Sequence, residues 1–445
     1  MTPFTLQEIA DVTGGRARGE ATVSASATLD SRQVLPGGLF VALAGERVDG
    51  HDYVAAAIRN GAVAVLSSRP VDAPGVLVDD VTRALGLLAS ENLRRVDVPV
   101  VAVTGSQGKT SVKDLLAHVL EAAGQTVATA GNFNNELGVP LTVLRADART
   151  AHLVVEMGAR GVGHIADLCR IAPPTIGAVL NVGHAHVGEF GSPERIAQAK
   201  GELVEALPHD GVAVLNADDP LVAPMRSRTR ARVLTFGRTG DVAIGRVTLD
   251  GTGSPRFALA HDGVVVDVRV PQIGVHHAMN AAAAAAVALA AGIDLETIAA
   301  RLATARSASP MRMERHERAD GLVVVNDAYN ANPESMAAAL RAVAAIADSR
   351  GIAVLGEMLE LGDDADESHR QIGRLAAELG FVRVIAVGEG ARLIAEGAGA
   401  VGELVDDVDE ATLTLSASLS GNEVVLVKAS RGARLERVAH GLLQA

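Results

Sequence analysis

The sequence predicts an α/β protein of three domains, in which a central parallel sheet is covered by helices on both faces. Three observations support this prediction. A chain of 445 residues exceeds what one hydrophobic core usually organises. From Val98 onward short apolar runs alternate with helical stretches, as in parallel strands joined by helices. A second alternating series follows the break at Ser307-Ala-Ser-Pro310, where proline and small residues indicate a loop.

The first 98 residues predict a small N-terminal α/β domain. Thr5-Leu-Gln-Glu8 fits a capping box at the start of a short helix. A strand over Gly37 to Leu43, a helix over Tyr53 to Asn60 and a strand over Ala62 to Leu66 follow.

Residues 99–308 predict the central domain. An apolar strand over Val98 to Thr104 is followed by a glycine-rich turn and a helix from Lys109 to about Gly124. Between 241 and 270, turns at Asp250-Gly251 and Asp262-Gly263 indicate antiparallel strands at the sheet edge. The alanine-rich run over 281–291 is too short to span a bilayer, so we expect a packed helix. Further apolar strands are expected at Leu153–Val155, Ile176–Asn181 and Val212–Asn216.

Residues 309–445 predict a C-terminal Rossmann-like α/β domain. Its strands are expected at Gly321–Asn326, Ile352–Leu355, Val382–Val387 and Val424–Val427. Ligands of open α/β sheets bind outside the carboxyl ends of the strands. We therefore expect the ligand site where the strand ends of the second and third domains face one another.

Composition excludes several classes of partner. The formal net charge is -13, so no global basic field gathers nucleic acid or an anionic membrane surface. The single cysteine, Cys169, predicts a buried thiol in a reducing compartment. The start of the chain has neither a basic nor an apolar leader region. We expect a cytoplasmic monomer without membrane insertion.

The segment Gly105-Ser-Gln-Gly-Lys-Thr-Ser111 predicts a phosphate loop that binds ATP with Mg²⁺. It lies between a buried strand and a helix, where backbone amides and the helix dipole favour phosphate. Lys109 is placed to reach the β- and γ-phosphates, and a hydroxyl of Thr110 or Ser111 to ligate Mg²⁺. Position 103 is not glycine, so only the shorter GxxGKT form is present. The central sheet is therefore expected to be of the P-loop type.

Polar residues after other strands are candidates for the same sheet edge. Glu156 follows a strand and is either an Mg²⁺ ligand or an exposed strand-end acid. In Asn181-Val-Gly-His184-Ala-His186, one histidine is a second metal ligand or both are turn residues. Lys200, by itself, is a solvated helical lysine.

Two asparagine-rich segments are further candidates. Asn132-Phe-Asn-Asn135 is suited to hydrogen-bonding a substrate or orienting metal-bound water, although such turns are common. Asp327-Ala-Tyr-Asn-Ala-Asn-Pro333 follows a strand of the third domain and is placed to reach a nucleotide across the cleft.

Taken together, these motifs resemble the Mur ligase family of peptidoglycan synthesis, and the resemblance runs along the whole chain. The matching segments, in order, are Asp30–Arg32, Pro36–Val41, Asp49–Asp52, Thr104–Ser111, Asn132–Asn135, Pro140–Thr142, Glu156–Ala159, Asn181–His186, Phe190–Ser192, Ala199–Glu202, His276–Asn280, Asp327–Pro333, Gly356–Gly362 and Lys428–Arg431. The version Asn330-Ala-Asn-Pro333 is similar to that of the dipeptide-adding members.

The resemblance implies an ATP-dependent ligase that joins D-alanyl-D-alanine to UDP-N-acetylmuramoyl-tripeptide through an acyl phosphate. It implies catalytic roles for Lys109, Glu156, His186 and Lys200, with Thr110, Glu156, His186 and a CO₂-derived carbamate on Lys200 as Mg²⁺ ligands. It adds nucleotide contacts to the phosphate loop (Gly105, Ser106, Gln107, Gly108, Lys109, Thr110 and Ser111) at Asn280, Arg312, Asp327 and Tyr329. The implied substrate-binding residues are Ser31, Arg32, Asp49, Gly50, His51, Asn132, Asn134, Asn135, Ser430 and Arg431.

Alternatives remain at this stage. A family member that adds a different amino acid would share most of these motifs. A P-loop kinase or ATPase would use the same loop without needing an amine acceptor. A nucleotide-binding protein without chemistry would bind ATP and not turn it over.

Overall fold

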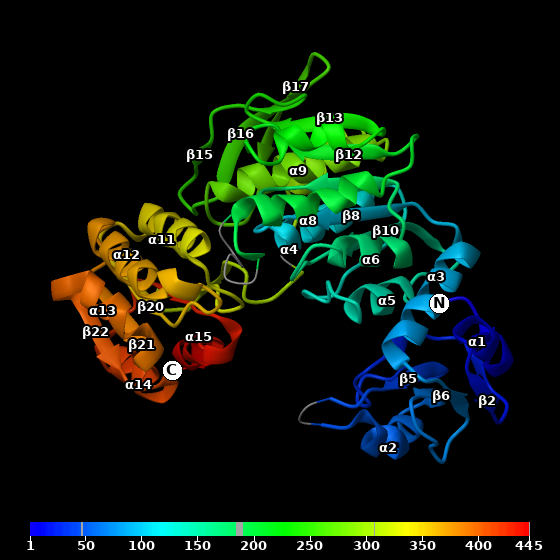
Figure 1. Cartoon of the computed structure of the whole chain (residues 1–445). Coiled ribbons are helices and arrows are strands. Elements are labelled where there is room, and N and C mark those ends of the chain that lie inside the picture. The colour runs from blue at the N-terminus through cyan, green and yellow to red at the C-terminus, as the bar shows by residue number, and fades with distance from the viewer. Residues whose placement is uncertain (46–47, 184–189, 307, 445) are drawn as a thin grey trace.

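The described residues form three large sheets, one in each of the N-terminal, central and C-terminal units, and a small two-stranded sheet in the N-terminal unit (Figure 1). This computed structural model describes residues 1–45, 48–183, 190–306 and 308–444. The predicted α/β class and three-unit architecture are confirmed. The exact boundaries at 98 and 308 stay predictions, although the sheets of neighbouring units begin and end on either side of them.

The N-terminal unit has a mixed sheet in the order β2-β7-β6-β5-β4 and a small pair, β1 with β3. The predicted capping box is present, because Thr5 Oγ1 accepts from Glu8 N while Glu8 Oε2 accepts from Thr5 N. The strands are β1 (Phe4–Thr5), β2 (Arg16–Arg18), β3 (Thr22–Val23), β4 (Ala27–Thr28), β5 (Gly38–Ala42), β6 (Ala62–Ser67) and β7 (Gly75–Leu77); the helices are α1 (Leu6–Thr13), η1 (Gly50–Tyr53), α2 (Val54–Arg59) and α3 (Val81–Val96).

The central sheet runs β15-β16-β14-β13-β12-β11-β8-β10-β9, with β17 paired to β16. Its strands from β9 to β14 are parallel, and β15, β16 and β17 form the predicted antiparallel edge. The strands are β8 (Val100–Thr104), β9 (Gln125–Ala128), β10 (Thr150–Glu156), β11 (Ile176–Val179), β12 (Val212–Asn216), β13 (Arg232–Gly237), β14 (Val242–Ile244), β15 (Thr248–Leu249), β16 (Pro255–His261) and β17 (Val264–Arg269).

Helices cover both faces of this sheet, and each face has its own apolar core. The alanine-rich helix α9 is buried against one face, as predicted, and packs beside α4. The helices are α4 (Lys109–Leu120), α5 (Gly138–Val143), α6 (His164–Ile171), α8 (Pro193–Glu205), η2 (Ala223–Arg228), α9 (His276–Ala290) and α10 (Leu295–Leu302).

The C-terminal sheet runs β18-β19-β23-β20-β21-β22, and only β18 is antiparallel to its neighbour. The strands are β18 (Glu314–Glu317), β19 (Val323–Asn326), β20 (Gly351–Leu355), β21 (Arg383–Val387), β22 (Gly402–Val405) and β23 (Val424–Lys428). The helices are α11 (Pro333–Ala347), η3 (Gly362–Asp364), α12 (Ala365–Glu378), η4 (Glu389–Ala391), α13 (Arg392–Ala398), η5 (Gly399–Val401), α14 (Val408–Ser418), η6 (Arg431–Ala433) and α15 (Glu436–Gln444).

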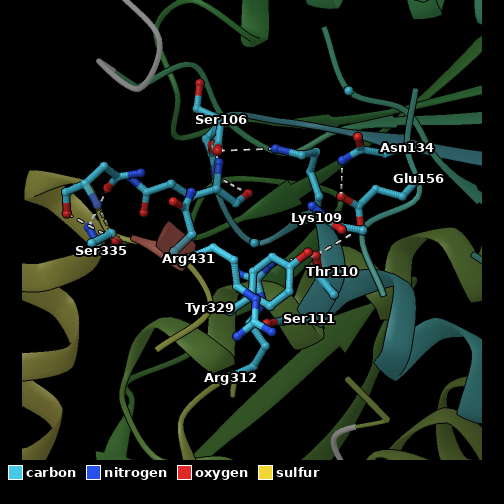
Figure 2. A pocket seen from close by; sticks show the side chains of 18 of the residues that line it. Ser106, Lys109, Thr110, Ser111, Asn134, Glu156, Arg312, Tyr329, Ser335 and Arg431 are labelled. Atoms are coloured by element: carbon cyan, nitrogen blue, oxygen red, sulfur yellow. Dashed lines mark hydrogen bonds between the residues drawn. The ribbon is translucent and has the colours of Figure 1, made fainter. Parts of the chain in front are cut away.

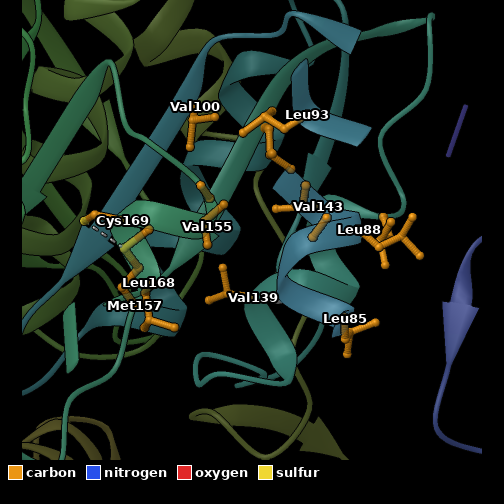
Figure 3. Close-up of a cluster of buried hydrophobic side chains, with 14 of the residues drawn as sticks. Leu85, Leu88, Leu93, Val100, Val139, Val143, Val155, Met157, Leu168 and Cys169 are labelled. Carbon is orange, nitrogen blue, oxygen red and sulfur yellow. Dashed lines mark hydrogen bonds between the residues drawn. The ribbon is translucent and has the colours of Figure 1, made fainter. Parts of the chain in front are cut away.

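A continuous apolar core joins the N-terminal and central units. Helix α3 packs on α5 and α6, and Leu85 and Leu88 of α3 share one cluster with Val139, Val143 and Leu168 (Figure 3). The predicted buried thiol, Cys169, belongs to this cluster. Among the described residues, no helix is long and apolar enough to cross a membrane.

Candidate functional site

The phosphate loop lies between β8 and α4, and hydrogen bonds brace it against the segment that follows β11. Gln107 N donates to Asn181 Oδ1 at 2.9 Å, and Gly183 N donates to Ser106 Oγ at 2.9 Å. Gly108 has a φ of 77°, and a Cβ there would lie 2.5 Å from Asn280 Oδ1. Only glycine fits at this position, because a side chain would meet both backbone strain and a close neighbour.

Lys109 is half-buried, with its amine turned back on the loop. Its Nζ donates to Gly105 O at 2.7 Å and to Ser106 O at 3.3 Å (Figure 2). Burial lowers the pKa of Lys109, while the charge of Glu156 raises it. The loop thus holds a cation among backbone groups where an anionic phosphate would complete its hydrogen bonds.

Glu156 ends β10 at the same sheet edge and is buried. Its Oε2 accepts from Thr110 Oγ1 at 3.0 Å, and its Oε1 accepts from Asn134 Nδ2 at 2.7 Å (Figure 2). The alternative of an exposed strand-end acid is therefore wrong. A hydroxyl and a carboxylate side by side are oxygen ligands of the kind that Mg²⁺ prefers.

Lys200 lies on α8 and lines the same cavity, with only 4% of the residue exposed. It is not a solvated helical lysine. Burial, with the charge of Lys109 as a second cause, places the pKa of Lys200 well below its usual value. Within the described residues, its amine has no hydrogen-bonding or ion-pair partner.

The C-terminal unit supplies the opposite wall. The guanidinium of Arg312 lies over the ring of Tyr329, 4.2 Å from its centroid, and its Nη2 is 3.4 Å from Thr110 Oγ1 (Figure 2). Asp327 is held internally, since Oδ2 accepts from Lys428 Nζ at 2.6 Å and Oδ1 accepts from Met313 N at 3.0 Å. Asp327 therefore anchors the backbone of Met313, the residue that follows Arg312.

A cavity of about 1050 Å³ lies between the two units and brings most of the predicted site together. The predicted residues that line it are Ser106, Gln107, Gly108, Lys109, Thr110, Ser111, Asn132, Asn134, Asn135, Glu156, Lys200, Asn280, Arg312, Asp327, Tyr329, Ser430 and Arg431. Gly105 lies behind the lining, and His186 lies outside the described residues.

The predicted N-terminal residues do not line this cavity. His51 is buried in its own unit, where Nδ1 lies 2.6 Å from Asp49 Oδ1 and Nε2 accepts from Ser68 N at 3.3 Å. Arg32 is exposed and pairs with Asp30 at 2.8 Å. The remaining two are Gly50, which begins η1, and the buried Ser31. In this arrangement the N-terminal residues and the phosphate loop are separate sites.

Two groups in the cavity region were not assigned a role from the sequence. Gln107 Nε2 donates to Glu334 Oε2, so a carboxylate of α11 lies against the phosphate loop. His277 lines the cavity with both ring nitrogens buried and unpartnered among the described residues. No local sequence pattern identifies a glutamate in a first helical turn, or a histidine in an alanine-rich helix, as a site residue.

A phosphate loop that faces a second α/β sheet across a cavity defines a nucleotide-binding protein of the P-loop class. Family models match three successive stretches of the chain: the Mur ligase family catalytic domain over residues 25–103, the Mur ligase middle domain over 103–288 and the Mur ligase glutamate ligase domain over 311–431. The chain belongs to the Mur ligase family.

Curated relatives match along the full length. The UDP-N-acetylmuramoyl-tripeptide--D-alanyl-D-alanine ligase of Mycobacterium tuberculosis (strain H37Rv) is 45% identical, covering 100% of this chain and 98% of the relative. The ligase of the same name from Escherichia coli K12 is 37% identical, covering 99% of each chain.

Solved structures agree with this assignment. A crystal structure of MurF from Acinetobacter baumannii has a TM-score of 0.89 at 32% identity, covering 100% of this chain and 99% of that one. MurF ligase from Thermotoga maritima in complex with ADP has a TM-score of 0.80 at 32% identity, covering 95% and 98%.

Proposed function

We propose that this protein is an ATP-dependent ligase that adds D-alanyl-D-alanine to UDP-N-acetylmuramoyl-tripeptide, a cytoplasmic step of peptidoglycan precursor synthesis. The observation that carries the proposal is the 45% identity over the full chain to a ligase named for this reaction. Residues 1–98 bind the UDP-sugar peptide, residues 99–308 bind ATP, and residues 309–445 receive the dipeptide.

The phosphate loop and Lys109 hold the triphosphate. The convergence of Thr110 and Glu156, 3.0 Å apart, supports an Mg²⁺ site at the start of α4, where the metal when bound would neutralise phosphate charge. Magnesium uses few protein ligands and takes the rest from phosphate and water. His186 is the further protein ligand that the family resemblance implies.

Lys200 is proposed to carry a carbamate. Only an unprotonated amine adds CO₂, and the burial that depresses the pKa of Lys200 favours that form. The product is a carboxylate-like oxygen ligand in place of a cation. This change relieves the repulsion between Lys200 and Lys109 in one cavity.

The reaction follows from these positions. The terminal carboxylate of the tripeptide attacks the γ-phosphorus and ADP leaves, while Lys109 stabilises the charge on the transferred group. The dipeptide amine then attacks the acyl phosphate, loses a proton and expels phosphate. An acyl phosphate hydrolyses easily, so the facing walls of the cavity serve to exclude water.

The remaining residues hold the ends of the substrates. Asn280, Arg312 and Tyr329 contact the adenosine side, with Asp327 fixing the segment that carries Arg312. Asn132, Asn134, Asn135, Ser430 and Arg431 contact the peptide substrates inside the cavity. The UDP-sugar contacts are assigned to Ser31, Arg32, Asp49, Gly50 and His51, which requires the N-terminal unit to present one end of a long substrate.

The first test is phosphate release from ATP with both substrates, each omitted in turn, and the product mass recorded. Release should need both, and the product should be heavier by the dipeptide less water. Release without the dipeptide would indicate an ATPase, and release with another amine would indicate a family member that adds a different amino acid.

Two variants test the named roles. Lys109→Ala should lower turnover by about 10³-fold without a change in the unfolding midpoint, and near-normal turnover would remove the loop from the mechanism. Lys200→Ala should lose most activity and regain part of it with added short carboxylates. Full activity in Lys200→Ala would contradict the carbamate.

A further inference from the structure

Three consecutive residues of helix α8, beginning at Lys200, face three different surroundings. Consecutive helical residues point about 100° apart. Lys200 lines the cavity, Gly201 faces Arg228, and the buried carboxylate of Glu202 faces α6. The helix is thus held from two sides next to the residue that enters the site.

Arg228, the last residue of η2, contacts the backbone of α8 directly. Its Nη1 donates to Ala197 O at 3.1 Å, and its Nη2 donates to Gln198 O at 2.9 Å. These carbonyls lie inside the helix, and each has a second lone pair available beyond the helical hydrogen bond. Arg228 Nε also donates to Oε1 of Glu205, the last residue of α8, at 2.8 Å. The guanidinium therefore binds one face of α8 through two backbone carbonyls and one carboxylate.

Gly201 makes this contact possible. A Cβ at position 201 would lie 1.8 Å from Arg228 Nη1 and 2.1 Å from its Cζ. Any other residue would drive the guanidinium off the two carbonyls. The atoms met belong to the end of a flexible side chain, so the guanidinium would move and the backbone of α8 would stay.

Glu202 fixes the other side. Its Oε2 accepts from Ala166 N at 3.0 Å, and its Oε1 accepts from Gly163 N. Both donors lie at the start of α6, where a carboxylate satisfies free amides and the helix dipole. Rotation of α8 about its axis would break the contacts of α8 with Arg228 and the contacts of Glu202 with α6 together.

Such restraint fixes where the side chain of Lys200 enters the cavity that it lines. We propose that Arg228 is a positioning residue for Lys200. Gly201 leaves the space in which its guanidinium packs against α8, and Glu202 holds α8 from the other side. The proposal rests on the proposed function for the role of Lys200, while the positioning itself is measurable without turnover.

The test compares the variants Arg228→Gln and Gly201→Ala and the double variant with wild type, each as the full-length protein. Arg230→Gln is the matched control, because Arg230 is an exposed arginine two residues away. The first readout is the carbamate signal of Lys200 in ¹³C NMR with ¹³C-bicarbonate. Each single variant should lower it at least threefold, the double variant no further, and Arg230→Gln not at all.

The second readout is the rate of reductive methylation of Lys200, measured by peptide mass spectrometry relative to Lys113. It should change at least threefold in both single variants. Affinity for the non-hydrolysable analogue AMP-PNP should stay within twofold of wild type, because the phosphate loop is untouched. That combination separates positioning from a general loss of structure.

The outcomes are distinct. Unchanged carbamate and methylation in folded variants, with only a lower unfolding midpoint, would show that Arg228 is merely structural and overturn the proposal. Additive losses in the double variant would overturn the link between Gly201 and Arg228. If wild type carries no carbamate, that part of the proposed function fails, and the methylation rate alone decides the positioning of Lys200.

Discussion

The joints of the central unit to its two neighbours differ in their balance of apolar and polar contacts. Toward the N-terminal unit the joint is mainly apolar, with Leu85 and Leu88 of α3 packed into a cluster that continues through the central unit (Figure 3). Asn92 of α3 adds buried hydrogen bonds to the central unit. Toward the C-terminal unit the described contacts include polar ones, among them Gln107 with Glu334 and Lys113 with Ser309. An apolar core resists sliding because any shift opens voids, whereas polar contacts can exchange with water or ligand. Ile273 of the central unit is also buried in the apolar core of the C-terminal unit. Because polar contacts lie at the phosphate loop, we expect the C-terminal unit to move more readily than the N-terminal unit.

The linker to the C-terminal unit is nevertheless tied at one point. Lys113 Nζ is buried, pairs with Asp114 Oδ1 and donates to Thr129 O at 2.8 Å, while Asp114 Oδ2 accepts from Ser309 N at 3.0 Å. The linker is thus fixed to α4 directly beyond the phosphate loop. A hinge here would turn about Ser309 while α4 stays in place.

The largest effect on stability is expected from Asp114→Asn. It leaves the Lys113 cation buried without a carboxylate, which costs about 3–5 kcal/mol. Urea unfolding should show this loss. The double variant Lys113→Met with Asp114→Leu, which removes both charges, should recover most of it. A cost below about 1 kcal/mol for Asp114→Asn would mean that the linker is not anchored by this pair.

Leu88→Ala tests the apolar joint. Leu88 is fully buried, and its truncation should cost about 2–4 kcal/mol. Because the cluster is shared, calorimetry should show the N-terminal and central units losing stability together, with the C-terminal transition unmoved. A separate early transition of the N-terminal unit alone would show that the two units are not one cooperative block.

The polar contact at the phosphate loop predicts a gain in nucleotide affinity when its charge is removed. The carboxylate of Glu334 lies against Gln107, where it repels an incoming triphosphate. Glu334→Gln should tighten AMP-PNP binding about three- to tenfold, measured by calorimetric titration. Gln107→Ala removes the neutral partner and keeps the charge, so it should not tighten binding. Equal effects of the two variants would assign the change to domain opening instead of charge.

Local sequence patterns predict the elements and the strand ends, whereas contacts between distant elements are not visible in the sequence. Periodicity and turns predict strands such as β12 at its observed bounds and place Glu156 and the phosphate loop at one sheet edge, because strand ends of a parallel sheet share an edge. The burial of Lys200 and the contact of Glu334 depend on packing between elements far apart in the sequence. Asp327 lines the cavity and its carboxylate is held by Lys428, so the nucleotide contact that its motif predicts stays a prediction.

The smallest effect is expected in the N-terminal unit, at the exposed pair Arg32 and Asp30. Arg32 is 85% exposed as a side chain, and water screens exposed ion pairs, so Arg32→Ala should leave the unfolding midpoint nearly unchanged. Hydrogen bonds from Arg32 lower the pKa of Asp30 from 3.8 to about 2. A carboxyl group with a depressed folded pKa adds stability above its unfolded pKa and loses it as pH falls through the folded value. Any stability difference between Arg32→Ala and wild type should therefore be present above about pH 4 and vanish toward pH 2.

A raised KM for the UDP-sugar peptide at pH 7, with stability unchanged, would assign Arg32 to substrate binding, and an unchanged KM would leave it only its bond to Asp30.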